Sequence, residues 1–212
     1  MTKLDEQLIS LYQNARGFKK LHIIVRHWLC PFNEVERHIP LTGKILDLGC
    51  GDGIFANLLA IKSPGRHVVG VDKDAKRIAL ANSTLSGKKN IEFRVSDIRD
   101  YLLDSDLKCA VLIDLPLETD RELLTRIYAA LPPAGVLIIK SMSQHTGWKH
   151  YFNLLHMATV DRILRRSFKQ NIYFLKESDF MRLLKETGFR VRFLNIDKGY
   201  PCPHCLYVCS KD

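Results

Sequence analysis

The feature that most constrains this chain is a glycine turn directly after a short apolar run, in the stretch KILDLGCGDG at residues 44–53. Ile45, Leu46 and Leu48 predict a buried strand. Glycines at every second position then remove side chains from the turn, which indicates that another group approaches this backbone closely. The G-x-G-x-G spacing, with Ile54 at the sixth position, differs from the G-x-G-x-x-G that seats a pyrophosphate. The turn therefore disfavours a nicotinamide cofactor.

Strand patterns alternate with helical patterns along the chain, which is typical of a parallel sheet with crossover helices. The expected strands are residues 44–48, 67–71, 90–95, 108–113, 135–140, 189–196 and 205–210. The expected helices are residues 18–29, 53–62, 74–84, 119–131 and 177–187.

Composition predicts one cytoplasmic domain. The 212 residues are 46% hydrophobic, enough to bury one substantial core, and no run approaches the roughly 20 apolar residues needed to cross a bilayer. The start, MTKLDEQLIS, lacks the pattern of a secretory signal, and the 6 cysteines are irregularly spaced, as expected for reduced thiols. The net charge of +9 is concentrated in the C-terminal third, which suits an anionic partner or a solvated helix face.

In an open parallel sheet, ligands bind outside the carboxyl ends of the strands. Asp72 follows the second strand, 21 positions after Gly51, where an acid can accept hydrogen bonds from both ribose hydroxyls. The third strand ends before Asp97 and Ile98, which offer a carboxylate and an apolar side chain to an adenine. The fourth ends before Asp114, near the reacting end of such a ligand.

Together these segments resemble the class I S-adenosylmethionine-dependent methyltransferases. The matching residues are 47–53, 70–72, 96–97, 114–116 and 131–138, in the order and spacing of that family. The resemblance implies a Rossmann-like, doubly wound α/β fold with seven strands in the order 3-2-1-4-5-7-6 and an antiparallel last strand. It also implies N-terminal helices and a helical insertion after strand 5. The expected parts of the single domain are a cap (1–43), a cofactor-binding core (44–140), the insertion (141–176) and the last helix and strands (177–212).

The resemblance also assigns S-adenosylmethionine as the cofactor and gives roles to individual residues. Asp114 could instead only cap the next segment, and the turn could be no more than a tight connection. The implied contacts are Asp47, Gly49, Cys50 and Gly51 with the methionine part, Asp72 with the ribose, Asp97 and Ile98 with the adenine, and the backbone near Asp114 and Leu115 with the sulfonium end. Lys73 is a further expected cofactor contact.

Two segments offer candidates for the acceptor site. The helix at 18–29 has an apolar stripe with His22 inside it and Arg26 at its edge; His22 is a catalytic candidate or a packed core histidine. The loop GYPCPHC at 199–205 brings Tyr200 and His204 to the same side as the cofactor, or is an ordinary proline-rich turn. Its cysteines lack the helix of a redox motif and are too closely spaced for zinc, so no metal is expected.

A third candidate is the insertion, whose apolar and basic residues include Trp148 and Tyr151. It could bind an acceptor or pack on the sheet. We expect methyl transfer to an oxygen atom of a small-molecule or lipid-like acceptor. The acceptor could carry an anionic group, and the protein could contact a membrane surface. His22, His204 and Asp114 are the catalytic candidates. The alternatives are an RNA or tRNA methyltransferase that uses the basic insertion, and a non-catalytic cofactor-binding scaffold or regulatory protein.

Overall fold

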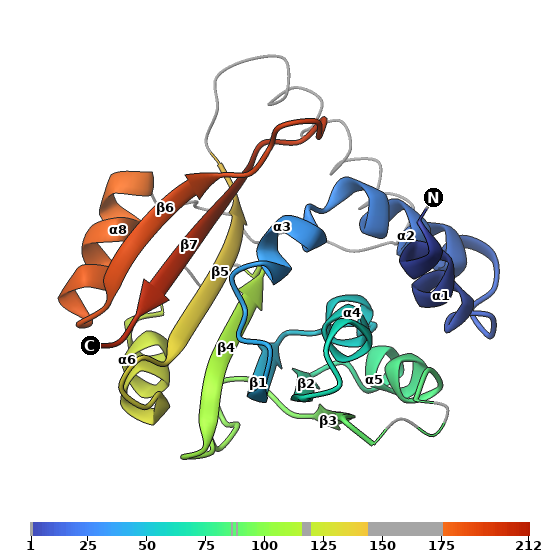
Figure 1. Cartoon of the computed structure of the whole chain (residues 1–212), viewed down its shortest axis with the longest axis horizontal. Helices are drawn as coiled ribbons and strands as arrows, with labels where there is room; N and C mark the ends of the chain where they lie inside the picture. Colours follow the sequence, from blue (N-terminus) through green and yellow to red (C-terminus); the bar gives the residue numbers. More distant parts are fainter. Residues whose placement is uncertain (1, 86, 88, 116–119, 144–175) are drawn as a thin grey trace.

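The fold is built on a seven-stranded sheet in the order β3-β2-β1-β4-β5-β7-β6 (Figure 1). Strands β1 to β5 are parallel, and β7 is antiparallel to both β5 and β6. This order confirms the predicted Rossmann-like α/β fold with an antiparallel last strand. The computed structural model describes residues 2–85, 87, 89–115, 120–143 and 176–212. The predicted insertion falls largely outside these residues, and so do Trp148 and Tyr151.

For the strands and helices whose ranges are given above, the predicted ends lie within two residues of the observed ends. Apolar patterns and turn residues mark both kinds of element. The strands are β1 (Gly43–Leu48), β2 (Arg66–Asp72), β3 (Ile91–Val95), β4 (Leu107–Ile113), β5 (Val136–Met142), β6 (Arg190–Asn195) and β7 (His204–Ser210). The helices are α1 (Lys3–Ser10), α2 (Gly17–Leu29), α3 (Phe32–Glu36), α4 (Ile54–Lys62), α5 (Ala75–Asn82), α6 (Arg121–Ala130) and α8 (Glu177–Glu186).

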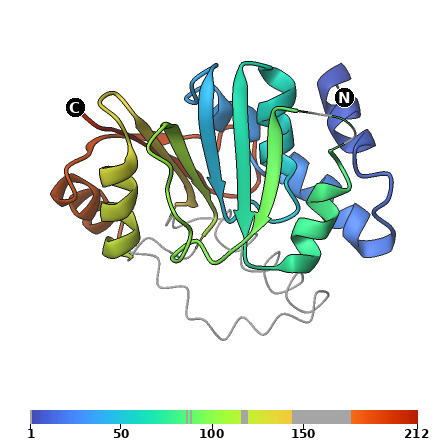
Figure 2. The same ribbon diagram turned by 90° about the horizontal axis from the view of Figure 1, so that it is seen from below.

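Helices cover both faces of the sheet. Helices α6 and α8 lie on one face, whereas α4 and α5, with α1 and α2 outside them, lie on the other (Figure 2). Successive strand residues point to opposite faces, so Ile45 packs in the core under α4 and Leu46 in the core under α6. Strands β1, β2, β4 and β5 are largely buried on both sides, which explains their continuous apolar runs, whereas β6 at the edge of the sheet is not. The carboxyl ends of the parallel strands β1 to β5 meet at one edge of the sheet.

Helix α2 turns a different face to the core than the sequence suggests. Phe18 and Trp28, from the predicted apolar stripe, are 70% and 47% exposed. Ile23 and His27 are the buried side chains, and His27 Nε2 lies 2.9 Å from the carboxylate of Asp5. The stripe that the helical periodicity detects is therefore largely at the surface of the molecule.

Arg66 joins the N-terminal segment to the sheet. Its fully buried guanidinium donates to the backbone carbonyls of Pro40 (2.7 Å), Ile39 (3.1 Å) and Leu59 (3.2 Å). A fourth contact is an ion pair of 2.8 Å with Glu36. A buried charge is tolerated only when it is paired and hydrogen-bonded, and here every arm of the guanidinium has a partner.

Replacing Arg66 with Met should therefore lower the free energy of unfolding by about 3–5 kcal/mol, because three carbonyls lose this donor and Glu36 keeps only its ion pair with Lys62. Urea denaturation of the purified variant measures this. The matched control is Arg37→Ala, which breaks the exposed ion pair with Glu34 and should cost less than about 1 kcal/mol. Equal losses in the two variants would show that Arg66 does not connect the two parts of the fold.

Candidate active site

The glycine turn after β1 is hydrogen-bonded to the end of β2. The backbone N–H groups of Gly49 and Cys50 donate to Val71 O at 2.7 and 3.0 Å, and the N–H of Gly51 donates to Asp72 Oδ2 at 2.9 Å. Gly49 and Gly51 have φ angles of 73° and 58°, a left-handed region that favours glycine. These three N–H groups already have partners, so they cannot hold a pyrophosphate as a phosphate-binding turn does. This agrees with the prediction from the glycine spacing.

Side chains of the protein itself lie against the bare backbone of this turn. A Cβ atom at Gly49 would lie 2.6 Å from the methyl groups of Leu115, and one at Gly51 would lie 1.9 Å from a guanidinium nitrogen of Arg77. The prediction that something approaches the turn closely is thus confirmed. Both neighbours are the ends of flexible side chains, which a ligand can displace. Leu115 was among the predicted cofactor contacts, whereas Arg77 was not.

Asp72 lies where the ends of β1 and β2 meet. Its Oδ2 accepts from Gly51, and its Oδ1 accepts from the N–H of Asp74 at 2.9 Å. Arg77 Nη1 is 3.8 Å from Oδ2. A carboxylate has about four lone-pair positions, so both oxygens can accept further hydrogen bonds. The side chain of Asp72 is buried apart from this edge, and Lys73 beside it is exposed.

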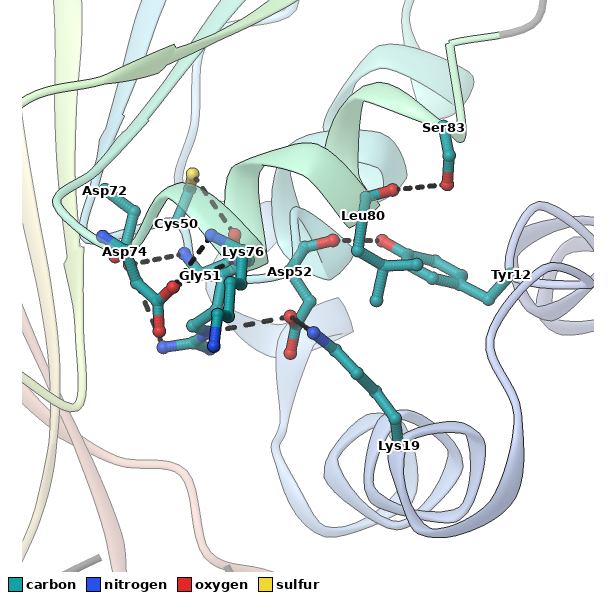
Figure 3. A network of polar contacts seen from close by, with 11 residues as sticks. Tyr12, Lys19, Cys50, Gly51, Asp52, Asp72, Asp74, Lys76, Leu80 and Ser83 are labelled. Atoms are coloured by element: carbon teal, nitrogen blue, oxygen red, sulfur yellow. Dashed lines mark hydrogen bonds and ion pairs between the residues drawn. The ribbon is translucent and has the colours of Figure 1, made fainter.

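The N-terminal helices are tied to the same turn through Asp52. Lys19 of α2 places its Nζ 3.4 Å from Asp52 Oδ1, and Arg77 of α5 places its Nε 3.6 Å from the same oxygen. The hydroxyl of Tyr12 donates to the backbone carbonyl of Asp52 at 2.9 Å (Figure 3). No local sequence pattern predicts these contacts, because they join segments that are far apart in the chain. They make α2 and the segment between α1 and α2 part of the walls of the site.

A pocket opens beside the turn. It is lined by Asp47, Arg26 from α2, Cys50 from the turn and Ile113 from the end of β4, among others. Asp47 is 2% exposed, and its Oδ2 has no hydrogen-bond partner. Burial raises the pKa of Asp47 to about 7, with Asp72 adding to the rise and Arg26 opposing it. A carboxyl group with one unpartnered oxygen in a pocket is well placed to meet a cationic ligand group.

Asp114 and Lys140 form an ion pair where β4 and β5 end. Lys140 Nζ donates to Asp114 Oδ1 at 2.6 Å, and the N–H of Asp114 donates to Lys140 O at 2.9 Å. Lys140 is 1% exposed, whereas the side chain of Asp114 is 31% exposed. Asp114 was a predicted site residue. Lys140 was not, because a lysine near the end of a predicted strand usually reaches solvent.

His204, a catalytic candidate, lies close enough to Lys140 to feel its charge. Its Nε2 is 2.8 Å from Leu29 O, the carbonyl at the end of α2. Burial, with the charge of Lys140, lowers the pKa of His204 to about 4. The ring is therefore neutral at pH 7 with its proton on Nε2, and the buried Nδ1 has no partner. Tyr200 contacts this ring edge-on, with 5.7 Å between ring centroids.

The other predicted site residues lie on separate elements. His22 lies one turn from Arg26 on α2 and is partly buried. Asp97 accepts the N–H of Arg99 at 3.0 Å, which closes a turn after β3, and Ile98 packs partly against the core under α6. The adenine role of Asp97 and Ile98 and the acceptor role of His22 therefore stay predictions.

The cysteines form no disulfides in the described part of the chain, and Cys202 and Cys205 are buried. Among the described residues, we find no cluster of three or more His, Cys, Asp or Glu side chains that could hold a metal ion. The described helices are also too short or too polar to cross a membrane.

Comparison with known proteins identifies the family. A model of the methyltransferase domain matches residues 29–193, which is most of the chain. The chain belongs to the methyltransferase-domain family. Among solved structures, a SAM-dependent methyltransferase from Aquifex aeolicus has a TM-score of 0.66 at 16% identity and covers 98% of each chain. Phosphoethanolamine N-methyltransferase 2 from Haemonchus contortus, solved with S-adenosylmethionine, has a TM-score of 0.66 at 15% identity and covers 100% of this chain and 60% of its own. Both show the shared fold.

Curated relatives are similar over different lengths. A trans-aconitate 2-methyltransferase from Variovorax paradoxus is 31% identical over 115 residues, which cover 52% of this chain and 43% of that protein. The chain thus matches less than half the length of this methyltransferase. A ubiquinone biosynthesis O-methyltransferase from Coxiella burnetii is 28% identical over 206 residues and covers 89% of this chain and 83% of its own length.

The raised pKa of Asp47 predicts a pH dependence of stability. Because the folded state holds this proton up to about pH 7 and the unfolded state releases it near 3.8, the folded state binds more protons in between. The stabilisation from the protonated carboxyl is therefore full below about pH 4 and is lost as pH rises to about 7. The difference amounts to at most about 4 kcal/mol.

Urea unfolding of the wild type and of Asp47→Asn between pH 4 and 8 tests this. The amide does not titrate, so the wild type should lose stability relative to the variant as pH rises through this range. Parallel curves would mean that Asp47 keeps an ordinary pKa.

Proposed function

We propose that this protein transfers the methyl group of S-adenosylmethionine to an oxygen atom of a small-molecule acceptor. The observation that carries the proposal is Asp72, a carboxylate bonded to the glycine turn at the carboxyl ends of β1 and β2, with lone pairs left for a ribose. The pocket with Asp47 and Arg26 adjoins this acid. Together they offer partners to the sugar and to the charged methionine tail of one ligand.

The cofactor would lie across the ends of β1, β2 and β4. From the sequence, Arg26 was expected near the acceptor. Its charge acts to lower the pKa of both Asp47 and Asp114, and its guanidinium suits the cofactor carboxylate. The unpartnered Oδ2 of Asp47 suits the cofactor ammonium. We assign Asp72 and Lys73 to the ribose, Asp97 and Ile98 to the adenine, Gly49, Cys50 and Gly51 to the methionine chain, and Asp114 and Leu115 to the sulfonium end.

The reaction is an in-line displacement. A bound S-adenosylmethionine would supply an activated methyl group: a lone pair of the acceptor oxygen would form the bond to the methyl carbon as the carbon–sulfur pair returned to sulfur. Because the cofactor is already activated, the protein mainly aligns the reactants and excludes water. Asp114 follows the end of β4, His204 and Tyr200 lie at or before the start of β7, and His22 remains a further candidate on α2.

Oxygen and a small acceptor are supported by the relatives. The Coxiella burnetii protein is an O-methyltransferase of ubiquinone biosynthesis, and the Variovorax paradoxus protein is a methyltransferase of trans-aconitate. Both names describe small-molecule chemistry. A lipid-like or anionic acceptor, contact with a membrane surface, and binding of RNA stay predictions.

Replacing Asp72 with Asn should weaken S-adenosylmethionine binding by about 1.5–3 kcal/mol, because the ribose hydroxyls lose a charged acceptor. This is roughly a 10- to 150-fold rise in Kd, measured by titration calorimetry. The control is Asp106→Asn at an exposed residue that pairs with Lys44, which should bind normally. Unchanged affinity in Asp72→Asn would remove the ribose assignment.

Methyl transfer itself is tested with S-adenosylmethionine labelled in the methyl group. The protein is incubated with separate small-molecule, lipid and RNA fractions of a bacterial extract. We expect label in the small-molecule or lipid fraction, in an alkali-stable ether or alkali-labile ester, and less of it with Asp72→Asn at a cofactor concentration near the wild-type Kd. Label only in RNA would favour an RNA methyltransferase, and cofactor binding without any transfer would favour a scaffold; either result contradicts the proposal.

A further inference from the structure

We propose that Lys140 is a positioning residue that holds the Asp114 carboxylate as the hydrogen-bond acceptor for a hydroxyl group on the methyl acceptor. The inference rests on the proposed function and refines it, because it names the kind of oxygen that is methylated. The two residues contact each other through both side chain and backbone, at the edge of the sheet where the sulfonium end of the cofactor would lie.

Lys140 is an unusual residue for its position. It lies in β5 with β4 on one side and β7 on the other, opposite Ile113 and Leu206. Its side chain is among the largest that are fully buried. Lysine is almost never fully buried unless it is paired, since removing an ammonium from water costs several kcal/mol. The carboxylate of Asp114 is the compensating group, at 2.6 Å.

Asp114 is held in place from two directions. Its φ of 53° lies in the left-handed region, which a non-glycine residue adopts at some cost and which occurs often at functional sites. The backbone N–H to Lys140 O fixes the main chain there, and the ion pair fixes the side chain. With Oδ1 on Lys140 and the side chain 31% exposed, Asp114 can still accept a hydrogen bond from outside.

The charges around this pair favour a neutral acceptor oxygen. Burial alone would raise the pKa of Asp114, but the charge of Lys140, the charge of Arg26 and the hydrogen bond from Lys140 outweigh it and lower the pKa, so Asp114 is ionised at pH 7. Arg26 comes from α2 and His204 from β7, and the buried Cys30 thiol, after α2, also faces Lys140. Lys140 is matched by Asp114, and Arg26 by Asp47 and the cofactor carboxylate. Each cation in this group already has an anionic partner, so none is available to bind a carboxylate on the acceptor. A hydroxyl group on the acceptor, by contrast, can donate a hydrogen bond to Asp114.

The step balances with groups already named. The hydroxyl oxygen forms its bond to the methyl carbon while the carbon–sulfur pair returns to sulfur. The hydroxyl proton passes to Asp114 and then to water, which restores the carboxylate. Because Lys140 makes Asp114 a weak base, its main contribution is to orient the oxygen, and the proton leaves once the new bond gives the oxygen positive charge.

Carbon-13 NMR of the protein labelled at aspartate carboxyl carbons tests the inference directly. The Asp114 signal, assigned with Asp114→Asn, should titrate at lower pH than ordinary in the wild type. In Lys140→Met it should move to higher pH, and in Lys140→Arg, which keeps a cation, it should stay low. An unchanged curve in Lys140→Met would show that Lys140 does not keep Asp114 ionised, which overturns the inference.

If Lys140→Met does not fold, Asp114→Asn gives the complementary measurement. The buried ammonium then lacks its partner, so the Lys140 Cε signal should titrate at lower pH than in the wild type; an unchanged value overturns the inference. Calorimetry with S-adenosylhomocysteine separates this result from the proposed function. If the wild type binds no cofactor product, the proposed function fails, while the two titrations still decide whether Lys140 governs Asp114.

The hydroxyl assignment is tested on the labelled product of the extract assay. An alkali-stable methyl ether supports it, and transfer should fall in both Asp114→Asn and Lys140→Met but be largely kept in Lys140→Arg. An alkali-labile methyl ester, which only a carboxylate acceptor gives, overturns it.

Discussion

The site depends on one carboxylate, Asp72, which binds two separate pieces of backbone. One oxygen accepts the N–H of Gly51 in the turn after β1, and the other accepts the N–H of Asp74 at the start of α5. Two adjacent parallel strands are thereby fixed to each other where a ligand of this fold binds. A charged hydrogen bond to each backbone segment contributes about 1.5–3 kcal/mol. The same residue that shapes the glycine turn therefore faces the ligand.

Negative charge gathers around that turn, and distant elements compensate it. Asp47, Asp52 and Asp72 are all buried within a few residues of the turn or of the next strand end. The cations come from α2 and α5: Lys19 and Arg77 reach Asp52, and Arg77 also reaches Asp72. Because the guanidinium of Arg77 rests on Gly51, a ligand that lies on this glycine must displace it. The cofactor would then take over contacts that Arg77 makes in its absence.

The sequence was sufficient to predict the sheet and the residues of the glycine turn, because both depend on local patterns: apolar runs, glycine spacing and an acid after each strand. Helical periodicity revealed an apolar stripe on α2 but not which face of the helix packs against the core. Phe18, in the stripe, is exposed, whereas His27 is buried. Ion pairs between strand ends, such as Lys140 with Asp114, depend on which strands become neighbours, and no local pattern encodes them. Arg77 was missed for the same reason.

A crystal structure with S-adenosylhomocysteine tests the central claim most directly. The account predicts that the ribose hydroxyls bind the Asp72 carboxylate, that the amino-acid tail lies between Gly49 and the pocket of Asp47 and Arg26, and that the Arg77 side chain has left Gly51. A ligand bound at another edge of the sheet would contradict it. So would a ligand in the pocket that leaves Asp72 without contact and Arg77 still resting on the glycine.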